Sequence, residues 1–347
     1  MIGKAIALAL FLWPASVFAQ GFAGLGTEAE EFTQPRQGYQ FAFPQDHGAH
    51  PDFRIEWWYL TANLKAADGT QYGAQWTLFR SALAPETKEG WQDPQVWFAH
   101  AAITTPDRHF VTERFARGGI GQAGVTASPF NAWIDEWQMS GAFEGNMAVS
   151  ATGPDFGYAF DMTASGPMIF HGDAGFSAKS ADGQASYYYS QPFFDVTGLL
   201  QLPDGEIPVS GQAWLDREWS SQPLSGNQTG WDWFSLSFDT GDKLMGFRLR
   251  QSDGDTFNSA TWISPSGQTT SYKDGAFSAN PISLADVKGK NIPVSWHVRL
   301  PAKGVDVTVE AQNNDSWMDV SLPYWEGPVG IQGSHTGQGY LEMTGYE

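Results

Sequence analysis

Short runs of strand-forming residues alternate with turn residues along most of the chain, and this alternation restricts the fold more than any other feature of the sequence. The run Arg54–Leu64 alternates and ends at Ala67-Asp68-Gly69, a sequence typical of β-hairpin turns. Gln71–Arg80 is the expected return strand. Helices are expected only as short segments, over Ala132–Gln138 and near Leu284. The pattern predicts an all-β fold, with further strands over Val96–Ile103, Phe143–Ser150, Phe156–Thr163, Ser186–Tyr189, Gly198–Leu202 and Ile207–Trp214.

One local pattern occurs twice in the chain. Glu56–Leu60 is followed by an Asp-Gly turn and the strand Trp76–Arg80. Asp232–Leu236 is likewise followed by a tight turn and the strand Gly246–Arg250. Each copy begins with an acid and a Trp, and each return strand ends in Arg. This order indicates a duplicated β-barrel-like unit.

The length of 347 residues agrees with two units, since a domain has about 100–200 residues. We expect an N-terminal domain over residues 46–221 and a C-terminal domain over residues 222–347. Small antiparallel barrels close their own sheet edges and can hold one apolar ligand.

The first nineteen residues have the features of a secretory signal peptide. Lys4 supplies the positive charge, Ala5–Val17 is a short apolar run, and Val17-Phe18-Ala19 is a small-residue cleavage site. The apolar run is too short to span a bilayer, so no stable membrane insertion is expected. We predict cleavage near Ala19 and a periplasmic location, with full secretion as the alternative. Residues 20–45 are expected to form a mobile segment.

Composition excludes several classes of function. The chain carries 38 acidic and 19 basic residues, for a formal net charge of -19, which disfavours nucleic-acid binding. It contains no cysteine, so a disulfide, a thiolate nucleophile and cysteine-ligated zinc are excluded. The sequence contains neither a Gly-x-Ser-x-Gly motif nor a P-loop nor a dinucleotide fingerprint, and no cofactor is expected.

The segment around Asp216 has the strongest chemical signal. In a strand, Trp214, Asp216 and Glu218 share one face, while Arg217 and Trp219 lie on the other. Burial and mutual repulsion would raise the pKa of one carboxyl group, which could then serve as a general acid. The alternative is a structural network in which Arg217 holds a carboxylate ionised and the tryptophans pack as core.

The predicted strand Ser186–Tyr189 is a second candidate for a functional role. Tyr187 and Tyr189 share one face, with Tyr188 on the other, and aromatic faces can line a pocket or stabilise a cation. The alternative is an ordinary strand with exposed tyrosines.

A separate cluster, His47, His50 and Glu56, is superficially metal-like, but no HExxH motif accompanies it.

No metal site is therefore expected, and His47 and His50 are expected to form hydrogen bonds at a pocket rim or in a loop. His100 lies on an apolar strand, where a lone histidine is more often a satisfied core residue than a catalyst.

Taken in order, these motifs resemble those of the AttH-like, carotenoid 1,2-hydratase-like proteins. The resemblance covers nearly all of the chain after the signal peptide. It rests on Asp46-His47, His50, Glu56-Trp57-Trp58-Tyr59, Phe98-Ala99-His100-Ala101, His171-Gly172-Asp173, Tyr187-Tyr188-Tyr189-Ser190, Trp214-Leu215-Asp216-Arg217-Glu218-Trp219, Trp231-Asp232-Trp233-Phe234, Tyr324-Trp325-Glu326-Gly327 and Gly339–Tyr346.

The resemblance implies two tandem lipocalin-like antiparallel β-barrel domains. It implies that Asp216 matches the general acid of the carotenoid hydratases, with Trp214 at the position of an aromatic residue two places earlier. Tyr187 and Tyr189 match positions at which those hydratases carry a supporting His and Trp, so both differ from that pattern. Pericyclases use the same architecture.

Three functions follow as hypotheses. The first is an exported protein that binds an apolar lipid- or isoprenoid-like ligand, as an accessory to an ABC-transporter permease. The second is a hydratase or isomerase that adds water to an alkene, with Asp216 as acid and Glu218 or a tyrosine positioning water. The third is a pericyclase. The expected ligand-binding residues are His47, His50, Glu56, Trp58, His100, Trp219, Trp231 and Trp233.

Overall fold

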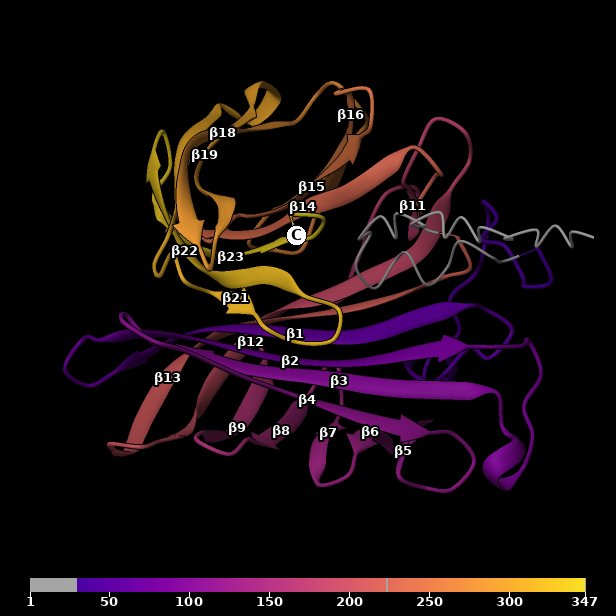
Figure 1. Cartoon of the computed structure of the whole chain (residues 1–347). Helices are drawn as coiled ribbons and strands as arrows, with labels where there is room; N and C mark the ends of the chain where they lie inside the picture. Colours follow the sequence, from indigo (N-terminus) through magenta and orange to yellow (C-terminus); the bar gives the residue numbers. More distant parts are fainter. Residues whose placement is uncertain (1–29, 223, 347) are drawn as a thin grey trace, which may run out of the picture.

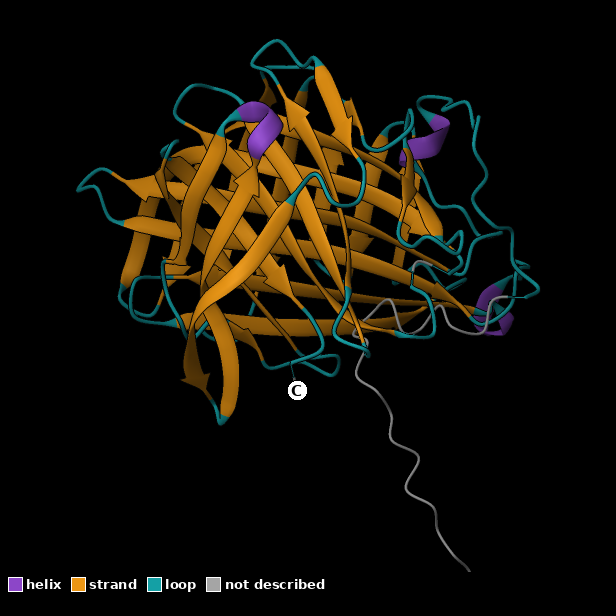
Figure 2. Ribbon diagram, turned by 90° about the horizontal axis from the view of Figure 1, so that it is seen from above, coloured by secondary structure: helices purple, strands orange, loops and turns teal. Residues whose placement is uncertain are grey.

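The computed structural model describes residues 30–222 and 224–346, and nearly all of their regular structure is β-strand (Figures 1 and 2). The predicted signal peptide lies outside the described residues. Within them, the helical segments are single 3-10 turns at Gln45–His47, Gly90–Gln92 and Pro301–Lys303. The all-β prediction is confirmed.

The first sheet has the strand order β4-β3-β2-β1-β13-β12-β9-β8-β7-β6-β5, and neighbouring strands are antiparallel. Two short strands, β10 and β11, pair with β12. The bounds are β1 Ile55–Ala66, β2 Gln71–Ala82, β3 Gln95–Thr104, β4 His109–Arg117, β5 Ala123–Ala127, β6 Phe130–Ile134, β7 Trp137–Gly141, β8 Asn146–Thr152, β9 Gly157–Ala164, β10 Ile169–Phe170, β11 Phe176–Ala178, β12 Ala185–Leu202 and β13 Gly205–Ser220.

The second sheet has the order β17-β16-β15-β14-β23-β22-β20-β19-β18, with β21 paired to β22. It packs above the first sheet in the view of Figure 1. The bounds are β14 Gln228–Phe238, β15 Lys243–Gln251, β16 Thr256–Ile263, β17 Thr269–Tyr272, β18 Ser278–Val287, β19 Lys290–Leu300, β20 Val305–Ala311, β21 Trp317–Met318, β22 Tyr324–Gly333 and β23 Gly337–Met343.

Both sheets are built in the same way. In each, the first strand pairs with the second and also with the last, so the sheet curls toward a barrel: β1 pairs with β2 and β13, and β14 pairs with β15 and β23. In both sheets, the fourth and fifth strands along the chain do not pair with each other and form the two ends of the sheet: β4 and β5 in the first, β17 and β18 in the second. The two curled antiparallel sheets have the two-domain lipocalin-like architecture that the resemblance implied. The chain passes from one sheet to the other between Ser220 and Gln228.

Neither expected helix forms. Residues 132–138 belong instead to the hairpin of β6 and β7, whose turn contains Asp135 with a positive φ of 50°. Ala132, Ile134, Trp137 and Met139 are buried in a period of two that fits strands on either side of a turn. Leu284 lies on β18 at the end of the second sheet, where its apolar side chain is exposed.

Two runs predicted as separate strands form the single long strand β12, which bends where the pairing with β13 shifts between Gln191 and Phe194. Pro192 lies within this irregular stretch, as expected for a residue that cannot donate a ladder hydrogen bond.

Residues 30–45 are the described part of the segment expected to be mobile, and several of them pack against the first barrel. Tyr39 stacks on Tyr187 with ring centroids 4.2 Å apart, and Phe41 and Phe43 pack against the first core. The Tyr39 hydroxyl donates to Asp46 Oδ1 at 2.9 Å. These apolar contacts hold the segment against the barrel.

Side chains fill the interior of each curled sheet. In the first, the tryptophans at positions 58, 76, 137 and 219 are fully buried. A separate apolar cluster lies where the two sheets meet, and it includes Tyr59, Tyr188, Trp214 and Trp233. The junction of the sheets therefore has an aromatic core of its own. No helix in the described ranges is long and apolar enough to cross a membrane.

Candidate functional site

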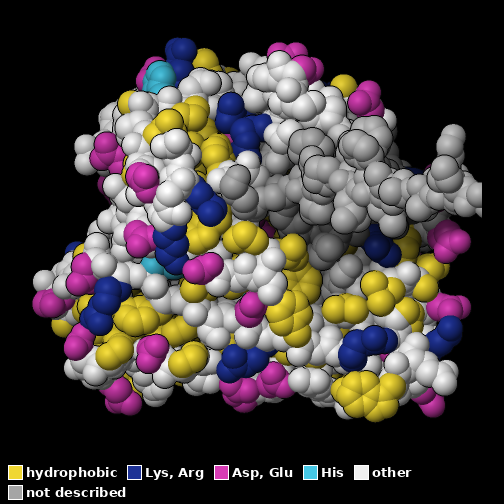
Figure 3. Space-filling model, viewed as in Figure 1, with side chains coloured by type: hydrophobic (Ala, Val, Ile, Leu, Met, Phe, Trp, Pro, Cys, Tyr) yellow, Lys and Arg dark blue, Asp and Glu magenta, His cyan; other side chains and the backbone are white. Residues whose placement is uncertain are grey.

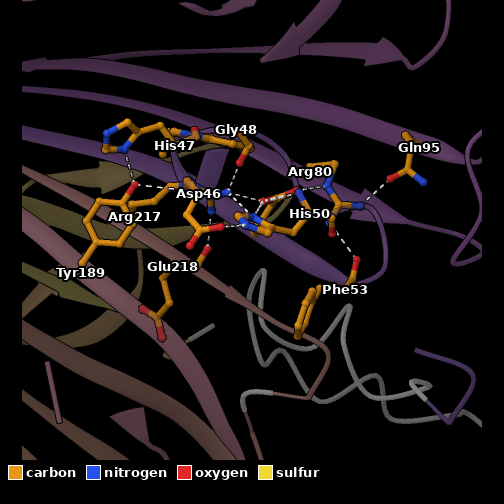
Figure 4. Close-up of polar contacts among 12 residues, drawn as sticks. Asp46, His47, Gly48, His50, Phe53, Arg80, Gln95, Tyr189, Arg217 and Glu218 are labelled. Carbon is orange, nitrogen blue, oxygen red and sulfur yellow. Dashed lines mark hydrogen bonds and ion pairs between the residues drawn. The ribbon is translucent and has the colours of Figure 1, made fainter. Parts of the chain in front are cut away.

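Alternate residues of β13 face two different environments. Tyr188 and Ser190 of β12 pair with Glu218 and Asp216, and their side chains lie on the side of the second sheet. Arg217 lies on the opposite side, toward the interior of the first barrel, as the close-up in Figure 4 shows. This alternation separates the acids from the arginine beside them.

Arg217 belongs to a buried ionic network inside the first barrel (Figure 4). Glu56 of β1 accepts from both Arg217 and Arg80 of β2, and it lies 3.3 Å from His50 Nδ1. His50 Nε2 is in turn 3.3 Å from Asp46 Oδ1. Burial disfavours ionisation of Glu56, but the two guanidinium groups hold its pKa well below its usual range. Within this network, the carboxylate paired with Arg217 is that of Glu56 and not that of Asp216 or Glu218.

Several predicted site residues lie in or beside this network rather than near Asp216. His47 Nδ1 is 2.8 Å from the Tyr189 hydroxyl, and the Tyr187 hydroxyl accepts from the Arg36 amide at 2.8 Å. Trp58 lies under the Arg217 guanidinium at 3.9 Å, and Trp219 stacks on His50 at 4.0 Å. Seven of the expected site residues therefore lie on the side of β13 away from Asp216: His47, His50, Glu56, Trp58, Tyr187, Tyr189 and Trp219.

A cavity lies between the two sheets, on the other side of β13. In the surface view of Figure 3, hydrophobic side chains are exposed along the junction of the sheets. Of the expected residues, the cavity brings together Asp216, Glu218, His100, Trp231 and Trp233. Its walls are predominantly aromatic, and they include Trp57, Tyr59, Phe79, Tyr188, Phe247 and Tyr324.

Asp216 is held in this cavity through one of its two carboxyl oxygens. Oδ1 accepts hydrogen bonds from Tyr188 at 2.8 Å, from Trp214 Nε1 at 2.9 Å and from the hydroxyl of Ser190. Oδ2 is buried and makes no hydrogen bond to any residue that the structure describes. A proton on Asp216 therefore has its place on Oδ2, where no protein group competes for it.

A second layer of donors orients these partners. Trp233 Nε1 donates to the Tyr188 hydroxyl at 3.1 Å, and His171 Nε2 is 2.6 Å from Ser190 Oγ. Since Ser190 donates to Asp216, its oxygen accepts from the His171 N–H. Burial lowers the pKa of His171 to about 3, so this imidazole is neutral. Each of the three donors to Asp216 favours its ionised form.

Burial decides the protonation state of Asp216. The loss of solvation raises its pKa from 3.8 to about 7, assisted by the charge of Glu218, while the three hydrogen bonds act in the opposite direction. A carboxyl group with a pKa near the working pH can both hold and release a proton.

Glu218, the residue expected to position water, lines the cavity and has two partners there. It accepts from Lys179 Nζ at 2.8 Å and from Ser186, and Lys179 also lies 4.3 Å over the Phe247 ring. The ion pair occupies Glu218 and places a cation at one end of the cavity.

His100 lies at the cavity wall, with Nδ1 3.0 Å from the Tyr324 hydroxyl of the second sheet. Burial lowers its pKa to about 3. Within the described residues, no group of three or more His, Asp or Glu side chains is arranged to hold a metal ion.

The site residues expected from the sequence did not include Tyr188, Ser190, His171, Lys179 or Glu342, although all of these except Lys179 lie in motifs that carried the resemblance. Alternation along the strand does separate Tyr188 from Tyr187 and Tyr189, but only the register of β12 against β13 shows which of them faces Asp216. His171 and Lys179 precede β12, and Glu342 comes from the second sheet. Spacing along the chain contains no signal for these three.

Changing Tyr188 to phenylalanine is expected to raise the pKa of Asp216 by about one pKa unit, because one of three donors that favour the carboxylate is lost. The pKa is measured from the infrared carbonyl band that disappears in Asp216→Asn. Tyr189→Phe is the matched control, since Tyr189 faces the first barrel and should leave the band unchanged. Equal shifts in both variants would contradict the assignment of faces.

Comparison with known proteins gives the following findings. Residues 34–346 match the family model described as AttH-like. An AttH protein from Nitrosomonas europaea has a crystal structure with 33% sequence identity and a TM-score of 0.82, covering 91% of this chain and 100% of that one. No curated protein matches the chain.

Two more distant structures are similar in fold. Kievitone hydratase from Nectria haematococca has 12% identity and a TM-score of 0.66, with 91% of this chain and 96% of that chain covered. CghA, crystallised with Sch210972, has 12% identity and a TM-score of 0.51, with 83% and 88% covered. At these identities the likeness shows the fold alone.

Proposed function

This chain belongs to the AttH-like family, and from that premise we propose that it is an acid-catalysed hydratase of an apolar alkene, acting in the cavity between its two sheets. Asp216 is the proposed general acid. The observation that carries the proposal is the arrangement of its two oxygens: three donors hold Oδ1, while Oδ2 is buried and has no partner in the described protein.

The chemistry needs an acid that is protonated before the reaction and stable as an anion after it. Burial with a pKa of about 7 supplies the first condition, and the donors Tyr188, Ser190 and Trp214 supply the second. In the hydration, the alkene takes the proton from Asp216, a water oxygen bonds to the resulting cation, and the water loses one proton. Microscopic reversibility makes the dehydration of the alcohol the same reaction run backwards.

The aromatic walls support the same proposal. Trp57, Trp231 and Trp233 line the cavity together with Tyr59 and Tyr324. Aromatic faces attract a cation through their quadrupole, by about 0.5–2 kcal/mol each, and they present no strong nucleophile that would trap it. An apolar alkene and its cation both suit such walls.

A test uses geraniol, farnesol, squalene and kievitone as trial alkenes. Kievitone is included because one protein of similar fold is named a hydratase of it. The purified protein is incubated with each compound in water enriched in heavy oxygen, and products are analysed by mass spectrometry. The proposal expects an alcohol that carries the heavy isotope from the solvent. Products at the level of heat-denatured protein for every compound would count against it.

A carrier of an apolar ligand is the second candidate, which the apolar cavity walls also favour. It retains the hypothesis of a periplasmic accessory to an ABC-transporter permease. A carrier would return each trial alkene unchanged after binding it, and Asp216 would then be a structural residue.

A further inference from the structure

Glu342 introduces a second carboxyl group into the cavity from the opposite sheet. It lies on β23, directly across the ladder from Glu326 of β22. Its Oε1 accepts from Trp231 Nε1 at 2.9 Å, and its side chain lines the same cavity as Asp216. Glu326 lies behind it, fully buried, and accepts from the hydroxyl of Tyr59 of β1. The two glutamates form a pair at the junction of the sheets.

The charge of this pair is not balanced by a cation. Among the described residues, neither Glu326 nor Glu342 makes an ion pair, and Lys179, the cation that lines the cavity, is paired with Glu218. The groups around the two glutamates include Tyr59, Tyr324, Tyr340 and Trp231 together with the acids of β13. Two adjacent carboxylates in apolar surroundings cannot both be ionised, so the pair retains a proton.

The position of that proton follows from burial. Loss of solvation and the charge of Glu342 raise the pKa of Glu326 well above its usual range. Burial raises the pKa of Glu342 to about 7, and the charges of Asp216 and Glu218 act in the same direction. Glu326 Oε2 is buried and has no hydrogen-bond partner among the described residues, so the proton of the pair has its place there. Glu342 has surface in the cavity and is the member that can exchange protons with a bound molecule.

We propose that Glu342 is the proton acceptor of the reaction, taking a proton from the water molecule as that water adds to the cation formed by Asp216. The inference rests on the proposed function. It assigns acid and base to opposite walls of one cavity, with the alkene between them. Glu326 is a positioning residue, because it carries the proton of the pair. Glu342 is therefore free to ionise.

The step balances without another reactant. The C–H bond forms with the proton of Asp216, the C–O bond forms with the water oxygen, and the O–H bond of that water breaks toward Glu342. The turnover leaves Asp216 ionised and Glu342 protonated. A proton then passes from Glu342 to Asp216 through water after the alcohol leaves, which restores the starting state.

The first test measures hydration by Glu342→Gln, with an alkene that the wild type converts, in deuterated water. Asp216 still protonates the alkene in this variant, but the cation returns its proton more often than it captures water. We expect at least about tenfold less alcohol, with deuterium incorporated into recovered alkene. Glu342→Asp is expected to regain part of the alcohol yield. Wild-type alcohol formation by Glu342→Gln would overturn the inference and leave the proposed function standing.

The second test does not depend on turnover. N,N-Dimethyldodecylamine, protonated at neutral pH, is used as a cationic probe, and dodecyl methyl ether is its neutral counterpart. Binding is followed by quenching of tryptophan fluorescence, since Trp57, Trp231 and Trp233 line the cavity. An ionised Glu342 predicts that Glu342→Gln loses about tenfold in affinity for the amine and none for the ether.

Glu310→Gln, an exposed glutamate on β20 of the same sheet, is the control and should bind both probes like the wild type. Equal amine affinity of Glu342→Gln and the wild type would overturn the inference. If the wild type converts no alkene but Glu342→Gln loses amine binding, the proposed hydration fails while the charged site at Glu342 is supported.

Discussion

Replacing Asp216 with asparagine is expected to lower the rate of alkene hydration by about 10²–10⁴-fold, the usual contribution of a general acid. Asparagine retains an oxygen that can accept from Tyr188, Trp214 and Ser190, but it has no proton to transfer. The cavity keeps its shape, so ligand affinity should stay within a few-fold of wild type. The measurement compares alcohol formation with binding of the same alkene, followed by tryptophan fluorescence.

Asp161→Asn is the matched control, because Asp161 is exposed on β9 and lies outside the cavity. It should hydrate the alkene at the wild-type rate. Hydration by Asp216→Asn at a comparable rate would show that Asp216 is not the acid.

The Asp216→Asn variant also tests the protonation state of Asp216 without any substrate. The pKa of Asp216 is raised from 3.8 to about 7 in the folded protein. Between these values the folded state binds a proton that the unfolded state has released, so this group's contribution to stability is lost as pH rises through that window. The advantage of wild type over Asp216→Asn in free energy of unfolding should fall by about 2–4 kcal/mol from pH 4 to pH 8. A constant difference would mean that Asp216 is ionised throughout.

The second large effect is on stability: Arg217→Met is expected to lower the free energy of unfolding by about 3–5 kcal/mol. Arg217 is fully buried, and its loss removes one of the two guanidinium groups that hold Glu56 ionised. It also removes donors to the Gly48 carbonyl and the cation over Trp58. Denaturant unfolding followed by fluorescence measures the change.

Arg299→Met is the control, because its pair with Asp306 is half exposed and worth about 0–1 kcal/mol. Similar losses for the two arginine variants would contradict a clamp around Glu56. Arg217→Met should also destabilise far more than Asp216→Asn, because Arg217 is paired with Glu56 and not with Asp216.

The strands around the site could be predicted because their side chains alternate. Residues 54–64 and 71–80 follow the period of two and form β1 and β2, and the Asp-Gly sequence between them marks the turn. The prediction of a helix over residues 132–138 was wrong, because this segment spans a two-residue turn between the short strands β6 and β7. The apolar residues on both sides of the turn, taken together, resemble the apolar stripe of a helix.

The site could be predicted only in part. Asp216, Trp214 and Glu218 were identified from one strand, since their common face follows from backbone geometry. Tyr187 and Tyr189 were placed beside Asp216 by resemblance, whereas Tyr188 makes the contact. That error has a specific cause: a register shift of one residue moves every side chain of a strand to its other face, and register depends on the partner strand.

The sequence by itself determined the all-β architecture, the duplicated order of strands and the separation of Asp216 from Arg217 on opposite faces of β13. These properties are local, because they depend on side-chain period and turn chemistry within a few residues. Only the tertiary structure decided that the cavity lies between the sheets, that Glu56 is the partner of Arg217, and that Glu342 and His171 join the surroundings of Asp216. Those contacts join residues far apart in the chain, and they depend on how two sheets pack, which no single strand specifies.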